Sequence, residues 1–171
     1  MEFNSMKYSL ITTQNHPISI NHPECTEDIN SLLKHECNSL VATTFTNAEI
    51  VINLDTAEAI LAHNQSRQRN KSMDITFGIS NVDLSIKMMV MVELRLNFEN
   101  PYNLNRQSLE DKVKFSLIVL TNFVPIYPKF IFVFQAKIKE EAKNRFYRMN
   151  PKIPSDYVVM DLNDLKAAFF V

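Results

Sequence analysis

The sequence of 171 residues contains a single glycine, Gly78, and no tryptophan. Globular proteins average about 7% glycine, so this chain lacks every motif that needs several glycines close together. The phosphate-binding P-loop, the GxGxxG dinucleotide fingerprint and the GxSxG nucleophile elbow are all absent. Their absence excludes most nucleotide-dependent enzymes and the α/β-hydrolases. Gly78 is also the one residue that is free to adopt a positive φ without cost.

Long hydrophobic runs and cysteines are also scarce. The longest apolar runs, such as 131–134, fall far short of the roughly 20 residues that span a bilayer. With no apolar secretory segment and only two cysteines, Cys25 and Cys37, the sequence predicts a cytoplasmic protein without membrane contact. The separation of the cysteines fits no closed zinc site. We therefore expect both to be small buried side chains.

The overall composition is that of a globular chain, with 46% hydrophobic and 22% charged residues. Its length predicts a single domain. Two His-Pro pairs interrupt the start, so we expect an irregular segment over residues 1–25. A core over 26–135 and a helix–strand–helix extension over 136–171 complete the expected domain.

Charge is distributed unevenly along the chain. The net charge of −1 hides an acidic first part, −6 over residues 1–66, and a basic later part, +6 over residues 87–152. Such asymmetry between parts of a chain indicates contact with a nucleic acid or with a membrane. The alternative is that basic helices simply present one solvated face to water.

Hydrophobic periodicity predicts helices and strands in mixed order. The expected helices cover 27–37, 56–64, 105–120, 138–149 and 163–169, and the expected strands cover 39–46, 49–53, 73–79, 87–98, 130–134 and 157–160. Residues 88–92 are apolar on both faces, which indicates a central strand. The fold class is therefore α/β, a mixed sheet flanked by helices with an antiparallel hairpin over 73–97.

Three charged residues interrupt the two strands of this hairpin. Glu93 and Arg95 are two positions apart and so share one face of their strand. A hairpin loop centred between residues 83 and 84 places Asp74 opposite Glu93, with Cβ atoms about 4.5–5.5 Å apart. Two carboxylates at that separation can share a divalent cation, and oxygen ligands favour Mg²⁺ or Mn²⁺ over zinc.

Asp74, 18 intervening residues and then Glu93-Leu94-Arg95 resemble the Asp…(Asp/Glu)-x-Lys signature of the PD-(D/E)XK nuclease-like superfamily. The surrounding order of elements is also similar to the restriction-endonuclease-like core of that family. The resemblance implies that Asp74, Glu93 and the Leu94 carbonyl bind Mg²⁺, which activates a water for attack on a phosphodiester. Arg95 would take the place of the lysine, although arginine effectively cannot lose its proton. Met73 stands where the family has proline.

The resemblance also suggests a role for the basic residues. A wholly polar loop over 65–72 carries Arg67, Arg69 and Lys71 just before Asp74. In a nuclease these residues would steer the phosphate backbone toward the metal. Further bases on the expected helices would extend the track, namely Lys112, Lys114, Lys143, Arg145 and Arg148.

Two alternatives remain open at this stage. Glu93 and Arg95 can be a structural ion pair in a protein-interaction module that has lost or never had catalysis, and a small-molecule binder is a third class. The apolar C-terminus, residues 169–171, either enters the core or covers a second copy of the chain in a homodimer.

Overall fold

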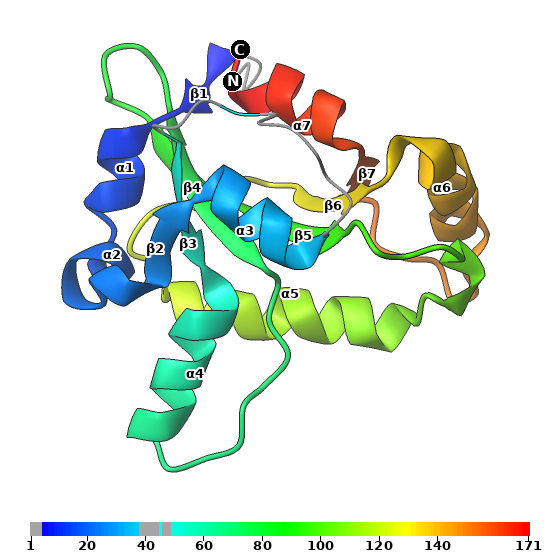
Figure 1. Cartoon of the computed structure of the whole chain (residues 1–171), viewed down its shortest axis with the longest axis horizontal. Helices are drawn as coiled ribbons and strands as arrows, with labels where there is room; N and C mark the ends of the chain where they lie inside the picture. The colour runs from blue at the N-terminus through cyan, green and yellow to red at the C-terminus, as the bar shows by residue number, and fades with distance from the viewer. Residues whose placement is uncertain (1–4, 38–44, 46–48) are drawn as a thin grey trace.

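The computed structural model describes residues 5–37, 45 and 49–171, which form a mixed sheet with helices on both faces (Figure 1). The α/β class expected from the sequence is therefore confirmed. The strands are β1 (Lys7–Tyr8), β2 (Thr26–Asp28), β3 (Ile50–Asn53), β4 (Ile75–Ser80), β5 (Lys87–Arg95), β6 (Phe130–Phe134) and β7 (Tyr157–Met160). The helices are α1 (Leu10–Gln14), α2 (Pro17–Asn21), α3 (Ile29–Glu36), α4 (Leu54–Asn64), α5 (Arg106–Leu120), α6 (Lys139–Arg148) and α7 (Leu162–Phe169), with short 3₁₀ helices η2 (Pro23–Cys25), η3 (Pro101–Asn103) and η4 (Ala136–Ile138).

The strand order is β2-β3-β4-β5-β6-β7, and β1 pairs with β4 beside this path. The strands from β2 to β5 pair in antiparallel fashion, whereas β6 and β7 run parallel to β5. In the β4–β5 hairpin Ile75 lies opposite Val92. This is the register that the sequence predicted. Asp74 directly precedes Ile75 and Glu93 directly follows Val92, so both acids lie at the end of this pairing.

Five of the described α-helices, α1, α3, α4, α5 and α7, begin at a short polar side chain that accepts a hydrogen bond from a first-turn N–H group. Asp28 caps α3, Asn53 caps α4 and Asn105 caps α5. At α7, Asp161 and Asp164 form a reciprocal capping box. The sequence located these helices to within about two residues, and α3 begins two residues later than expected because Thr26–Asp28 form β2.

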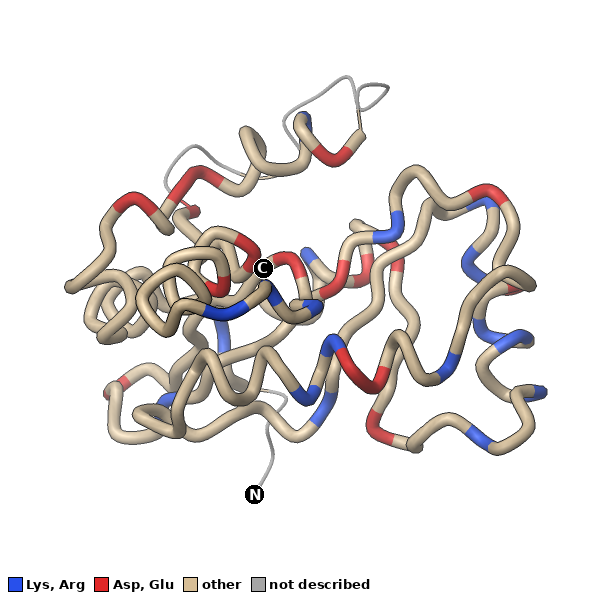
Figure 2. The backbone as a smooth tube through the Cα atoms, turned by 90° about the horizontal axis from the view of Figure 1, so that it is seen from below, with Lys and Arg blue, Asp and Glu red and all other residues tan. Residues whose placement is uncertain are grey.

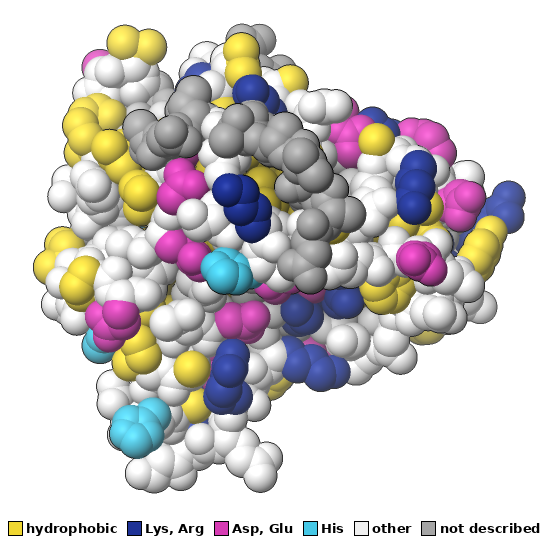
Figure 3. All heavy atoms as spheres, viewed as in Figure 1, with side chains coloured by type: hydrophobic (Ala, Val, Ile, Leu, Met, Phe, Trp, Pro, Cys, Tyr) yellow, Lys and Arg dark blue, Asp and Glu magenta, His cyan; other side chains and the backbone are white. Residues whose placement is uncertain are grey.

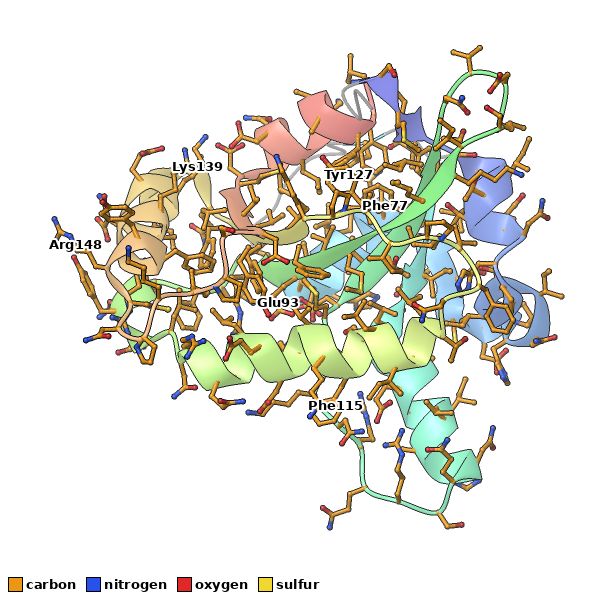
Figure 4. The ribbon with its side chains drawn as sticks, turned by 180° about the vertical axis from the view of Figure 1, so that it is seen from behind. Phe77, Glu93, Phe115, Tyr127, Lys139 and Arg148 are labelled. Carbon is orange, nitrogen blue, oxygen red and sulfur yellow. The ribbon has the colours of Figure 1, made fainter. Side chains whose placement is uncertain are left out.

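The sheet separates two apolar cores. One lies between the sheet and helices α4, α5 and α6, and the other lies between the sheet and helices α3 and α7. Side chains alternate between the two faces of the sheet along β5, so this strand contributes to both cores. Met89 and Met91 enter the first core, and Val90 and Val92 enter the second. Glu93 continues the methionine series, so its side chain lies between the sheet and α5, on the opposite side from Phe77 (Figure 4).

The start of the chain differs from the expectation. Residues 1–25 were predicted to be irregular, but from Lys7 onward they form β1, α1, α2 and η2. The two prolines do not prevent helices here, because Pro17 is the first residue of α2 and Pro23 is the first of η2. Proline is favourable at that position, where its missing N–H is not needed. The strand expected over 39–46 lies outside the described residues except for Phe45.

Gly78 serves a purpose other than a positive φ. Its φ is not positive, and the left-handed positions among the described residues belong instead to Ser66, Leu84, Thr121 and Asn122. A Cβ atom at Gly78 would lie 2.5 Å from the Cβ of Thr12 and 2.8 Å from the backbone nitrogen of Thr13. Glycine is therefore needed because α1 crosses β4 at close range.

The remaining expectations concern burial. Cys25 and Cys37 are buried in the apolar cores, as predicted. The C-terminus enters the second core: Phe169 is buried, and the ring of Phe170 stacks on Tyr8 at a centroid distance of 5.0 Å. Within the described residues no helix has the length and apolar character needed to cross a membrane.

Candidate carboxylate and lysine site

Asp74 and Glu93 converge on the face of the sheet that is covered by α5. The Leu94 backbone N–H donates a hydrogen bond to Oδ2 of Asp74 at 2.5 Å, and the Asp74 N–H donates to the Val92 carbonyl. These contacts fix the carboxylate of Asp74 across the hairpin from Glu93. Both residues are almost excluded from water, since Asp74 is 8% exposed and Glu93 is 1% exposed.

Two cations from different elements neutralise Glu93. Nζ of Lys112, on α5, lies 2.8 Å from Oε1 and donates a hydrogen bond to Oε2 at 2.9 Å. Nε of Arg95 lies 2.9 Å from Oε1, but its N–H points elsewhere, so the contact is an ion pair without a hydrogen bond. Lys112 also lies 4.0 Å from Oδ1 of Asp74 and therefore bridges the two acids.

Burial dominates the proton affinities at this site. It raises the pKa of Asp74 to about 8, and the negative charge of Glu93 adds to the increase, whereas Lys112 and the Leu94 N–H oppose it. Burial also raises the pKa of Glu93, against the opposing charges of Lys112 and Arg95. Asp74 therefore holds its proton near neutral pH, because two adjacent carboxylates with little water cannot both ionise easily.

Two further acids act on this site. Glu36, at the end of α3, contributes to the raised pKa of Asp74, and Asp55, in the first turn of α4, contributes to that of Glu93. Burial and the charge of Asp55 in turn raise the pKa of Glu36. Acidic side chains from α3 and α4 and Lys112 from α5 therefore act on the same two carboxylates. Acidic and basic side chains lie near one another on the face of the molecule that Figure 3 shows.

The oxygen atoms present suit a hard divalent cation. Within the part of the chain that the structure describes, no three His, Cys, Asp or Glu side chains come together as metal ligands. Mg²⁺ is commonly held by one or two carboxylates and completes its shell with water, so Asp74 and Glu93 fit this pattern. The N–H and C=O groups of one strand residue face the same edge, and the Leu94 carbonyl therefore faces the side of Asp74.

The basic loop before Asp74 has protein partners of its own. Arg67 donates two hydrogen bonds to Glu58, at 2.7 and 3.2 Å, and Glu58 is buried. Burial alone would raise the pKa of Glu58, but hydrogen bonds from Arg67 and from the Asn70 N–H hold it below its usual value. Arg69 lies 3.6 Å from Asp55.

Lys71 and its neighbours fasten this loop to α5. Nζ of Lys71 donates to the Ser108 hydroxyl at 3.3 Å, and the Met73 N–H donates to the buried Ser116 hydroxyl at 2.7 Å. The structure therefore brings Lys112 and Arg95 to the carboxylates. It places Arg67, Arg69 and Lys71 along the adjoining loop.

The sequence did not assign Lys112 to the carboxylates but grouped it with the bases for a nucleic-acid track. Helical spacing gave the only available signal. Lys112 lies three residues after Leu109 and one before Val113, which are both buried against the sheet, so a side chain at position 112 borders the apolar face. The strand residue that Lys112 contacts depends on how α5 crosses the sheet, and this crossing could not be predicted from the sequence.

Comparison with known proteins adds no relative: no family model, curated protein or solved structure matches this chain. The class defined by the fold and the site is therefore a mixed α/β protein with a buried pair of carboxylates bridged by a lysine.

Proposed function

We propose that the chain is a nuclease-like protein that contacts nucleic acid and uses a divalent cation for phosphodiester hydrolysis. The observation that carries the proposal is the convergence of Asp74 and Glu93, from paired strands, on one lysine. The β4–β5 hairpin, the α5 crossover and the parallel strand β6 also follow the order that the PD-(D/E)XK resemblance implies.

In this proposal Asp74, Glu93 and the Leu94 carbonyl hold Mg²⁺ or Mn²⁺. The ion, when bound, lowers the pKa of a bound water and stabilises charge on the phosphate. Asp74 must release its proton to act as a ligand, since metal binding requires the deprotonated form. Lys112 takes the position that the resemblance gave to Arg95. Lysine can exchange its proton whereas arginine effectively cannot, and Arg95 is left to hold Glu93 in place.

One observation favours a second candidate function, a non-catalytic interaction module. Two cations already accompany the negative charge of Glu93 without a metal, and both Glu93 oxygens lie within 2.9 Å of a cationic nitrogen. A buried polar network of this kind can serve only to specify the fold. A metal would have to displace the Lys112 ammonium from Glu93.

Metal-dependent stability separates the two candidates. We expect Mn²⁺ to raise the melting temperature of the parent protein but not of Glu93→Gln, because an ion that binds only the folded state stabilises it. Glu99→Gln removes the same charge from an exposed residue just after β5 and should respond to Mn²⁺ like the parent. An equal Mn²⁺ response in all three proteins would favour the interaction module.

Cleavage tests the chemistry itself. The purified protein is incubated with labelled single-stranded and double-stranded DNA and RNA in the presence of Mn²⁺. The proposal expects products from the parent and from Glu99→Gln, and none from Asp74→Asn or Glu93→Gln. Cleavage that survives in Asp74→Asn would come from a contaminant or from another site and would refute the assignment.

A further inference from the structure

A polar cavity lies where the start of α5 meets the end of α6. It has a volume of about 360 Å³, within the range of small-ligand sites, and is lined by residues 104–107, Arg145 and residues 149–151. Lys and Arg residues gather at this end of the molecule, around α6 (Figure 2). None of its lining residues belongs to the carboxylate site.

Two arginines from different helices, Arg106 and Arg145, line this cavity. Arg106 begins α5 and donates from Nη2 to Glu110 at 2.8 Å, and Arg145 belongs to the last turn of α6 and donates from Nη2 to the Leu104 carbonyl at 3.2 Å. A guanidinium has five N–H donors. The Nε–H groups of both arginines are buried without an acceptor, and Arg145 has no carboxylate partner within the described residues.

This cavity is separate from the carboxylates. Arg106 and Lys112 are six positions apart on α5, which places them about 120° apart around the helix axis. Lys112 reaches Glu93 on one flank of the helix, so Arg106 lies toward the other flank, where Arg145 approaches from α6. One helix therefore presents bases to two different places.

We propose that the cavity between Arg106 and Arg145 binds a phosphate group. One guanidinium group that donates two hydrogen bonds uses both oxygens of a carboxylate. A phosphate has enough oxygens to accept hydrogen bonds from two guanidinium groups at once. The first-turn N–H groups of α5 lie at the same place and add a favourable field for an anion. The phosphate belongs either to a nucleic-acid strand or to a free phosphorylated small molecule. The inference holds whether or not the carboxylates hydrolyse anything.

Inorganic phosphate is the first probe, compared with sodium chloride and sodium acetate at equal ionic strength. We expect phosphate to raise the melting temperature of the parent by about 3 °C when it exceeds its dissociation constant about fivefold. The rise should vanish in Arg145→Gln. It should persist in Arg148→Gln, which removes the same charge from an exposed residue on the same helix that does not line the cavity.

Arg106→Gln provides an independent variant from the other helix in case Arg145→Gln does not fold. If both arginines hold one phosphate, Arg106→Gln should also abolish the rise. An equal response to phosphate and acetate, or a phosphate response that survives in both variants, overturns the proposal.

A labelled oligonucleotide, added without metal so that no cleavage occurs, identifies the source of the phosphate. The cavity is assigned to a nucleic-acid strand if inorganic phosphate displaces the oligonucleotide. In that case Arg145→Gln should also weaken oligonucleotide binding and make its salt dependence shallower. A phosphate response without such binding assigns it to a small molecule. Because this assay needs neither Asp74 nor Glu93, its failure is distinguishable from a failure of hydrolysis.

Discussion

The raised pKa of Asp74 predicts how the stability of the protein depends on pH. In the unfolded chain Asp74 is ionised above about pH 4, whereas in the folded protein burial holds its proton up to a pKa of about 8. The unfolded state therefore binds fewer protons in this interval, and the free energy of unfolding falls as the pH rises. With these two pKa values the loss between about pH 6 and pH 8 is about 2 kcal/mol.

Asp74→Asn is the matched comparison, because an asparagine resembles the protonated acid and can still accept the hydrogen bond from the Leu94 N–H. The other charged residues of the site are the same in both proteins, including Glu93, whose pKa is also raised. They are Glu36, Glu93, Arg95 and Lys112. The difference between the two stability curves therefore isolates Asp74. Urea unfolding at several pH values measures it.

We expect the two proteins to be similar in stability below about pH 4. The Asp74→Asn variant should then become steadily more stable than the parent as the pH rises, and its advantage should be about 2 kcal/mol larger at pH 8 than at pH 6. Below about pH 4 the acid is protonated in both states, so its contribution becomes constant. A difference that does not change with pH between 6 and 8 would show that Asp74 is ionised in the folded protein, and the reasoning from burial would be refuted.

Three further substitutions test the contacts around the site by urea unfolding. Lys112→Met should cost about 2 kcal/mol near neutral pH, since it leaves Glu93 with one cationic partner, and a cost below that of the exposed change Lys114→Met would argue against the bridge. Ser116→Ala should cost about 1–2 kcal/mol because it leaves the Met73 N–H unpaired in the interior; a neutral result would mean that the loop before β4 does not depend on α5. Gly78→Ala should cost about 1–3 kcal/mol, since its Cβ would overlap α1, and unchanged stability would show that α1 does not pack closely on β4.

Most of the regular elements were predictable because their signals are local. Alternation over residues 73–79 and 87–98 predicted β4 and β5, and the register followed from one assumption about the loop. The N-terminal segment was not predictable in the same way. The prolines there were expected to break helices, but at the first position of α2 and η2 proline is compatible with a helix. The close packing of α1 on Gly78 is a contact between distant residues, which the local sequence pattern does not reveal.

The site was predictable only as far as strand geometry reaches. Because side chains alternate along a strand and the register of a hairpin follows from its loop, Asp74 and Glu93 could be paired from their positions alone. Lys112 could not be assigned to this pair from the sequence. The strand residues that a helix side chain contacts depend on the crossing angle and rotation of the helix, and these depend on the whole helix–sheet interface. Arg95 is two positions from Glu93 and on the same face of the strand, so it was the natural candidate, yet from that position it can only lie beside the acid.

The position of Lys112 changes what the resemblance implies. An arginine in the lysine position suggested a degenerate site, because a guanidinium keeps its proton under all ordinary conditions. With Lys112 supplied from α5, the cluster contains two acids and one amine, and Arg95 becomes a group that holds Glu93. Under the proposed function, Lys112 would supply from a helix the charge that the motif places on the strand. An arginine at position 95 is then no argument against the proposed chemistry.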